Sequence, residues 1–117
     1  MRKRRVLFVC SANLQRSPTA ENLFRDWKGL WQSKSAGTMP SFNGNPITQG
    51  LVDWADLVLV MESDHAEYVQ ANFKTNPDKL RVLHVPDRYV RDDPELIEEL
   101  RMKVIPILEE WQEQNDR

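Results

Sequence analysis

Apolar residues in the sequence gather into four short runs that are separated by longer segments of mixed character. The runs cover Val6–Val9, Trp31–Ser35, Leu57–Met61 and Leu80–Val85. The first and third are continuous stretches of Val, Leu, Phe and Met rather than alternations of apolar and polar residues. Strands covered on both faces have this composition, so the pattern predicts strands inside a parallel sheet.

The segments between these runs carry apolar residues at helical spacing. Helices are expected from Ser17, over Thr48–Trp54, over Asp64–Phe73 and from Asp93 onward. Asp93 suits the N-cap of the last helix, and Pro94 suits its first position. Pro106 interrupts the apolar stripe of this helix and is expected to kink or split it.

The alternation of strands and helices determines the expected fold class. Parallel strands that follow one another through helices are joined by right-handed crossovers. The order therefore predicts an α/β fold, a three-layer helix–sheet–helix sandwich around a four-stranded parallel sheet. With 117 residues and neither an internal repeat nor a linker, the chain is expected to form one domain over residues 1–117.

Charge and cysteine content exclude several classes of function. The 16 basic and 18 acidic residues give a net charge of −2, so no basic excess indicates nucleic-acid binding. No apolar run approaches the length of a membrane span. A single cysteine forms no internal disulfide, which favours a reducing, cytoplasmic location. Two separate histidines and one cysteine give no metal-binding pattern, so neither a metal nor a cofactor is expected.

Cys10, the only cysteine, ends the first apolar run and opens a short polar loop that closes on Arg16. Open parallel sheets bind ligands beyond the carboxyl ends of their strands, where this loop is expected to lie. Ser17 and Pro18 suit the N-cap and first turn of the following helix. The N–H groups at that helix start would face an anion and favour a thiolate at Cys10. A thiolate beside the planar guanidinium of Arg16 is suited to covalent phosphoryl transfer.

The stretch CSANLQRS, from Cys10 to Ser17, fits the pattern C-x5-R-[S/T]. In this position, and followed by PTAENLF, it resembles the phosphate loop of the low-molecular-weight protein tyrosine phosphatase family. SAGT at 35–38, GNP at 44–46 and ADLVLVM at 55–61 resemble further landmarks of that family. A cysteine at a strand end is often only a small apolar residue. The combination of thiol, loop, arginine and helix start nevertheless favours a functional role.

The resemblance implies a cysteine-dependent phosphatase that hydrolyses phosphotyrosine or a similar aryl phosphate monoester through a phosphocysteine intermediate. Cys10 would attack phosphorus, while Arg16 and the loop amides hold the phosphoryl oxygens. The expected phosphate-binding residues are Ser11, Ala12, Asn13, Leu14, Gln15, Arg16 and Ser17. Asn13, in a left-handed conformation, is expected to support the loop together with Ser17 and Ser35. The expected partner is a phosphorylated protein or a small aryl phosphate.

Protonation of the leaving oxygen needs an acid, which the family supplies from an aspartate after the last strand. Asp87 directly follows the predicted strand, with Tyr89 two residues on, and is the preferred general acid. Asp93 and Pro94 retain the Asp-Pro pair usual in the family, but a helix start explains them better. Asp92 and Asp93 stay open as alternatives to Asp87.

Two aromatic residues are expected beside the phosphate loop. Tyr89 and Phe42 would form walls against which an aromatic substrate stacks. His65 is expected to lie exposed in the first turn of its helix.

Some features depart from the family pattern. Gln15 stands where many members have a second loop cysteine, and Ala12 replaces a glycine. The stretch between Pro46 and Ala55 is much shorter than usual, which alters the substrate entrance and leaves the chemistry intact. This shortening motivates an alternative function, a phosphate- or phosphopeptide-binding module with little turnover. An arsenate reductase ranks lower, because with Cys10 alone it would depend on external thiols.

Overall fold

A computed structural model describes residues 3–115 and shows strands and helices in alternation. The strands are β1 (Arg4–Cys10), β2 (Trp31–Gly37), β3 (Leu57–Val60) and β4 (Leu80–Val82). The α-helices are α1 (Arg16–Phe24), α2 (Gln49–Trp54), α3 (Ser63–Asn72) and α4 (Pro94–Asn115). Short 3-10 turns, η1 (Trp27–Gly29) and η2 (Pro77–Lys79), precede β2 and β4.

The four strands form one parallel sheet in the order β2-β1-β3-β4. β1 lies inside the sheet, and its last five residues, Val6 to Cys10, are all buried. Its continuous apolar composition follows from this position, because helices cover both faces of an inner parallel strand. The predicted α/β sandwich with a four-stranded parallel sheet is confirmed.

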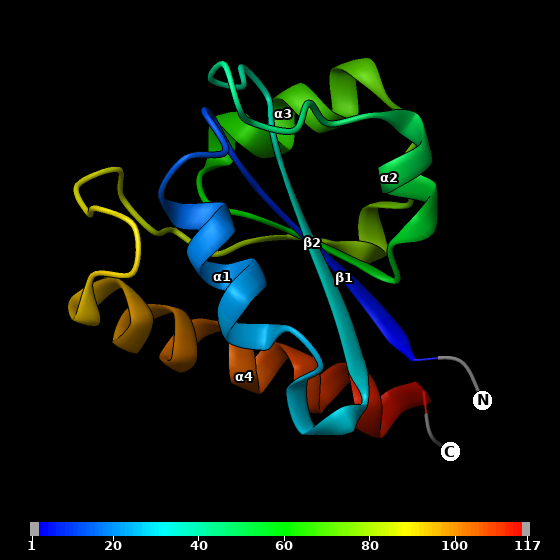
Figure 1. Cartoon of the computed structure of the whole chain (residues 1–117). Helices are drawn as coiled ribbons and strands as arrows, with labels where there is room; N and C mark the ends of the chain where they lie inside the picture. The colour runs from blue at the N-terminus through cyan, green and yellow to red at the C-terminus, as the bar shows by residue number, and fades with distance from the viewer. Residues whose placement is uncertain (1–2, 116–117) are drawn as a thin grey trace.

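Two apolar cores lie on opposite faces of this sheet. Figure 1 shows α1 and α4 on one side of the sheet and α2 and α3 on the other. Alternate residues of β1 enter each core: Phe8 packs toward α1 and α4, whereas Leu7 and Val9 pack toward α2 and α3. Cys10 belongs to the Phe8 side and is the last residue of the strand.

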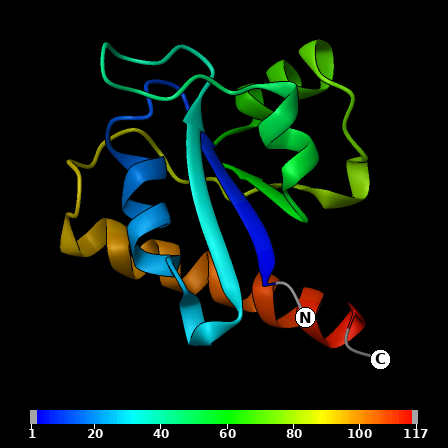
Figure 2. The same cartoon turned by 45° about the vertical axis from the view of Figure 1, so that its right-hand side comes forward.

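The connections that follow β1, β2 and β4 gather at one end of the sheet, as Figure 2 shows. This end carries the carboxyl termini of the parallel strands, where ligands bind in open α/β sheets. Residues 11–15 link β1 to α1, and residues 83–93 link β4 to α4. The thiol of Cys10 and the carboxylates that follow β4 are therefore brought to the same edge.

Two of the predicted element boundaries near the site need correction. α1 begins at Arg16 rather than at a Ser17 N-cap, and Gln15 occupies the cap position without a side-chain cap bond. β4 ends at Val82 rather than at 85; two residues on, His84 takes a left-handed φ of 58°, which no strand accommodates.

Pro106 was expected to kink or split the last helix, and it does not split it. α4 runs through Pro106 as a single helix. Pro106 is exposed, so water can satisfy the carbonyl group that its missing N–H leaves unbonded. Val104 and Leu108 on either side are fully buried and hold the helix against the core. Within residues 3–115, α4 and the other helices are all too short or too polar to span a bilayer.

Candidate active site

A hollow with a volume of ≈ 200 Å³ lies at the carboxyl end of β1. Its lining consists of Cys10, Ser11, Ala12, Leu14, Gln15, Arg16 and Asp87. Six of these residues come from one short segment that joins β1 to α1, and Asp87 comes from the loop after β4. The fold therefore brings together a thiol, a guanidinium group and a carboxylate that the sequence separates.

The segment after β2 holds the loop of residues 11–15 by its carbonyl groups. The N–H groups of Thr38, Met39 and Ser41 donate to the carbonyl oxygens of Cys10, Ser11 and Ala12, at 3.0, 2.8 and 2.9 Å. Within residues 3–115, no N–H group from residue 12 to 15 donates to another protein atom. The carbonyl oxygens are thus occupied on the outside of the loop, while several donors remain available. Such a set of N–H groups next to a helix N-terminus binds anions.

Two glycines make this contact between segments possible. A Cβ atom on Gly37 would lie 2.5 Å from the Ser11 carbonyl oxygen and 3.0 Å from the Asn13 nitrogen. A Cβ atom on Gly44 would lie 2.7 Å from the Ala12 carbonyl oxygen. The glycines in SAGT and GNP are therefore required by close packing against the loop.

Asn13 supports the loop from inside. Its φ of 55° confirms the predicted left-handed conformation. Its side-chain amide donates to Ser17 Oγ at 2.9 Å and to Ser35 Oγ at 3.0 Å, and its Oδ1 accepts from Asn45 N–H at 2.8 Å. Ser35 Oγ in turn donates to Glu21. One side chain thereby joins the loop to α1, β2 and the segment before α2.

Cys10 is 2% exposed, and its Sγ lies 3.0 Å from the hydroxyl oxygen of Ser17. Ser17 is fully buried in the first turn of α1 and also receives the Asn13 amide. Its position explains why it is not the N-cap: its hydroxyl faces the thiol rather than the helix start. A hydroxyl at this distance can donate to a thiolate and stabilise it.

Arg16 is 2% exposed and is held by neighbouring segments. Its Nη1 donates to Glu62 Oε2 at 2.9 Å and to the Val85 carbonyl oxygen at 2.8 Å. Nε lies 3.8 Å from Asp87 Oδ1, and among the described residues Nη2 has no partner. The guanidinium is fixed through one nitrogen, so the others can bind two oxygens of an anion.

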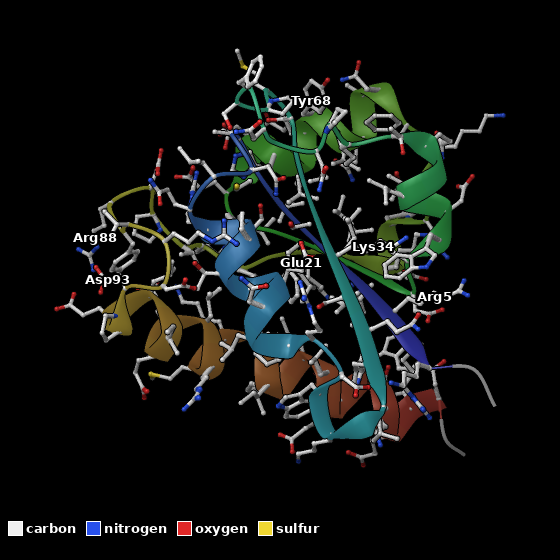
Figure 3. The ribbon with its side chains drawn as sticks, in the orientation of Figure 1. Arg5, Glu21, Lys34, Tyr68, Arg88 and Asp93 are labelled. Carbon is white, nitrogen blue, oxygen red and sulfur yellow. The ribbon has the colours of Figure 1, made fainter. Side chains whose placement is uncertain are left out.

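Among the three candidate acids, Asp87 alone lines the hollow, and its side chain is 67% exposed. Asp93 Oδ1 accepts from Glu95 N–H at 2.9 Å, which is the N-cap contact expected at the start of α4. Figure 3 shows Asp93 at the outer side of the loop that leads into α4. Asp92 has a φ of 63°, and its N–H donates to Thr19 Oγ1.

The structure corrects both predicted aromatic walls. Tyr89 is only 7% exposed; its hydroxyl donates to Glu99 at 2.8 Å and accepts from Arg88 at 2.9 Å. It packs in the core under α4 because the loop after β4 turns back toward this helix. Phe42 is fully exposed and is not part of the lining. Leu14, 48% exposed, is instead the large apolar side chain of the hollow.

His65 was expected to be exposed, but it is 1% exposed and contacts the loop. Its Nδ1 accepts from the Glu62 N–H at 3.0 Å, and its Nε2 lies 2.8 Å from Ser11 Oγ. The helical spacing contained a signal for this: His65 precedes the buried Val69 by four residues and so shares its face. Glu62, Asp64 and His65 lie close enough to share a metal ion, yet both ring nitrogens of His65 already have partners.

Comparison with known proteins shows the family of this chain. Residues 5–52 match the family model described as "Low molecular weight phosphotyrosine protein phosphatase". A protein-arginine-phosphatase from Bacillus subtilis (strain 168) is 32% identical, and the match covers 67% of this chain and 69% of the relative. The chain therefore belongs to the low molecular weight phosphotyrosine protein phosphatase family, whose members are cysteine-dependent phosphatases.

Solved structures have the same fold. A low molecular weight phosphotyrosine phosphatase from Vibrio cholerae O395 superposes with a TM-score of 0.80 at 24% identity, covering 95% of this chain and 98% of the other. A cysteine-to-serine mutant of the arginine phosphatase YwlE, with a phosphorylated active-site serine, gives a TM-score of 0.70 at 26% identity. That match covers 95% of this chain and 97% of the other. This chain is accordingly an enzyme of the phosphatase class.

We expect Gly37→Ala to destabilise the protein by about 1–3 kcal/mol, because the new methyl group would overlap the Ser11 carbonyl oxygen. Urea denaturation measures this change. Gly50→Ala is the matched control, since nothing but the Thr48 hydroxyl at 3.8 Å approaches its Cβ position in α2. In the control, the free energy of unfolding should increase by about 0.5–1 kcal/mol, because Ala has a higher helix propensity than Gly. Equal effects at both positions would contradict the packing argument.

Burial lowers the pKa of His65 below its ordinary value of 6.5, and the nearby Arg16 lowers it further against the opposing effects of Asp64, Glu62 and Asp87. The unfolded chain therefore takes up this proton first as the pH falls. The free energy of unfolding should decrease as the pH drops from 6.5 through the folded pKa, and His65 should have no such effect above 6.5. His65→Gln should lose this part of the pH dependence in urea denaturation between about pH 5 and pH 7.5. If the free energy of unfolding varied with pH in the same way in wild type and in His65→Gln, the lowered pKa could not be assigned to His65.

Proposed function

We propose that this enzyme hydrolyses aryl phosphate monoesters, such as phosphotyrosine in proteins, with Cys10 as the nucleophile. The observation that carries the proposal is the loop itself. Its carbonyl oxygens are held outward by Thr38, Met39 and Ser41, and its N–H groups remain available beside the thiol and Arg16. Donors that are fixed before the substrate arrives stabilise the charge of a transferring phosphoryl group.

In the first step, Cys10 Sγ attacks phosphorus, the S–P bond forms and the bond from phosphorus to the leaving oxygen breaks. Asp87 gives its proton to the leaving oxygen. The loop N–H groups, together with Nε and Nη2 of Arg16, hold the three remaining oxygens throughout. The product alcohol or phenol leaves, and phosphocysteine remains.

In the second step, Asp87 is the base. It takes a proton from a water molecule that attacks phosphorus, the S–P bond breaks and inorganic phosphate forms. The thiolate that leaves is stabilised by the Ser17 hydroxyl, whose oxygen lies 3.0 Å from Sγ. Asp87 can reach both the leaving oxygen and the attacking water, because it lines the hollow and lies 3.8 Å from Arg16 Nε.

The lining of the hollow supports an aryl leaving group. Leu14 is a half-exposed apolar side chain at the mouth, where an aromatic ring bound through its phosphate can contact it. The curated relative is a protein-arginine-phosphatase, which makes phosphoarginine the second candidate. A charged guanidinium would lose hydration against Leu14 without gaining a hydrogen bond from it. We therefore place aryl phosphates before phosphoarginine.

The roles of Cys10 and Asp87 can be tested with two substrates, p-nitrophenyl phosphate and phenyl phosphate. Cys10→Ser should abolish turnover of both. Asp87→Asn should lower kcat by about 100-fold for phenyl phosphate, whose poorer leaving group needs the proton, and by less for p-nitrophenyl phosphate. Asp93→Asn is the matched control and should stay near wild type, because Asn caps a helix as well as Asp.

An equal loss at Asp87 and Asp93, or a loss at Asp93 alone, would contradict the assignment of the acid. A folded wild-type protein that binds inorganic phosphate but turns over neither substrate would support the phosphate-binding module instead.

Leu14→Asn should raise KM for p-nitrophenyl phosphate about fivefold and leave kcat nearly unchanged, since the ring contact is the same in the bound substrate and in the transition state. Phe42→Asn is the control and should change neither constant, because Phe42 lies outside the lining. Steady-state kinetics measure both. A larger rise in KM for Phe42→Asn than for Leu14→Asn would instead support the predicted contact between Phe42 and the substrate ring.

A further inference from the structure

His65 connects the start of α3 to the first residue of the loop after Cys10. Its ring is 1% exposed, and each nitrogen has one partner, Glu62 N–H for Nδ1 and Ser11 Oγ for Nε2. The phosphatase mechanism above assigns no role to this residue. A buried histidine with two directed contacts is more constrained than packing alone requires.

The contact with Glu62 determines which nitrogen of His65 carries the proton. A backbone N–H can only donate, so Nδ1, at 3.0 Å from the Glu62 nitrogen, must accept with its lone pair. A neutral ring then carries its proton on Nε2. Nε2–H therefore donates to Ser11 Oγ across 2.8 Å.

The direction of the hydrogen bond from His65 also determines whether the Ser11 hydroxyl can donate to a ligand. An oxygen that accepts from Nε2–H keeps its own proton for another acceptor. Within residues 3–115, Ser11 Oγ has no second hydrogen-bond partner. Ser11 lines the hollow beside Cys10 and Arg16. The acceptor that fits an anion-binding loop is an oxygen of the bound phosphoryl group.

The surroundings keep the ring of His65 in this form. Burial lowers the pKa of His65, and Arg16 lowers it too, so that the net shift is downward even though Asp64, Glu62 and Asp87 raise it. A proton on Nδ1 would face the Glu62 N–H and break that contact. The neutral ring with its proton on Nε2 is thus the state that the site accommodates.

We infer that His65 is a positioning residue that orients the Ser11 hydroxyl as a donor to the bound phosphoryl group. The inference rests on the proposed function, because it concerns phosphate held in the same loop. Ser11 thereby adds a side-chain donor to the N–H groups of the loop. The start of α3 then supports the anion site in two ways: Glu62 accepts a hydrogen bond from Arg16, and His65 contacts the Ser11 hydroxyl.

Substitution of His65 by Asn or by Gln should remove one of its two hydrogen bonds and keep the other. Asn places a side-chain oxygen near the position of Nδ1, so His65→Asn keeps an acceptor for Glu62 N–H and loses the donor to Ser11. Gln places a side-chain nitrogen near the position of Nε2, so His65→Gln keeps the donor to Ser11. A purely structural role at the start of α3 would favour Asn, whereas the inference favours Gln.

The test is calorimetric titration of each folded variant with inorganic phosphate. Ser11→Ala and His65→Asn should each bind phosphate about tenfold more weakly than wild type, the usual loss for one hydrogen bond to a charged group. His65→Gln should stay close to wild type. Because His65 acts through Ser11, the double variant Ser11→Ala/His65→Asn should bind no more weakly than Ser11→Ala. His84→Asn is the matched control at the only other histidine and should bind as wild type does.

Unchanged phosphate affinity in Ser11→Ala would overturn the inference, and so would a further loss in the double variant or equal losses in His65→Asn and His65→Gln. If His65→Asn fails to fold, unchanged phosphate affinity in Ser11→Ala still overturns the inference. Hydrolysis of p-nitrophenyl phosphate by wild type is measured in parallel. If wild type hydrolyses p-nitrophenyl phosphate and Ser11→Ala binds phosphate as tightly as wild type, the inference is wrong and the proposed function stands. If wild type neither hydrolyses p-nitrophenyl phosphate nor binds phosphate, both are wrong.

Discussion

The hydrogen bonds between the segment after β2 and the carbonyl oxygens of the loop after β1 determine how the whole site works. A short loop could turn either its carbonyl or its N–H groups toward a ligand. Because Thr38, Met39 and Ser41 occupy the carbonyl oxygens of residues 10–12 from outside, the N–H groups remain for an anion. The sheet order places β2 beside β1, which brings these two segments together at the carboxyl end.

Each neighbouring element adds one constraint to this loop. β2 contributes Gly37, whose missing side chain admits the loop, and α1 contributes the Ser17 hydroxyl beside the thiol. Glu62, the N-cap residue of α3, holds Arg16, and His65 in the first turn of α3 contacts Ser11. The site is therefore organised before any substrate binds, as catalysis by charge stabilisation requires. Asp87 is the exception, because it is exposed on the loop between β4 and α4.

Much of this arrangement could be predicted from the sequence, because local patterns encode it. Continuous apolar runs indicated buried parallel strands, and the spacing from Cys10 to Arg16 indicated an anion loop. Contacts between distant segments were not encoded in this way. Helical spacing did not show that His65 meets Ser11, and the loop after β4 gave no sign that Tyr89 turns into the core. The effect of Pro106 on α4 was misjudged, because the free-energy cost of a proline inside a helix depends on its surroundings. The cost is smaller where the carbonyl group that loses its hydrogen bond faces water.

In the proposed mechanism, the loop binds the oxygens of a phosphoryl group while Cys10 carries that group covalently. Mass spectrometry of enzyme quenched in acid during turnover of p-nitrophenyl phosphate tests this most directly, because phosphocysteine is the one species that the mechanism cannot do without. We expect a phosphoryl group on the peptide that contains Cys10, and this species should accumulate when its breakdown is slowed in Asp87→Asn. Turnover without any modified peptide, or a phosphoryl group on a different residue, would contradict this mechanism.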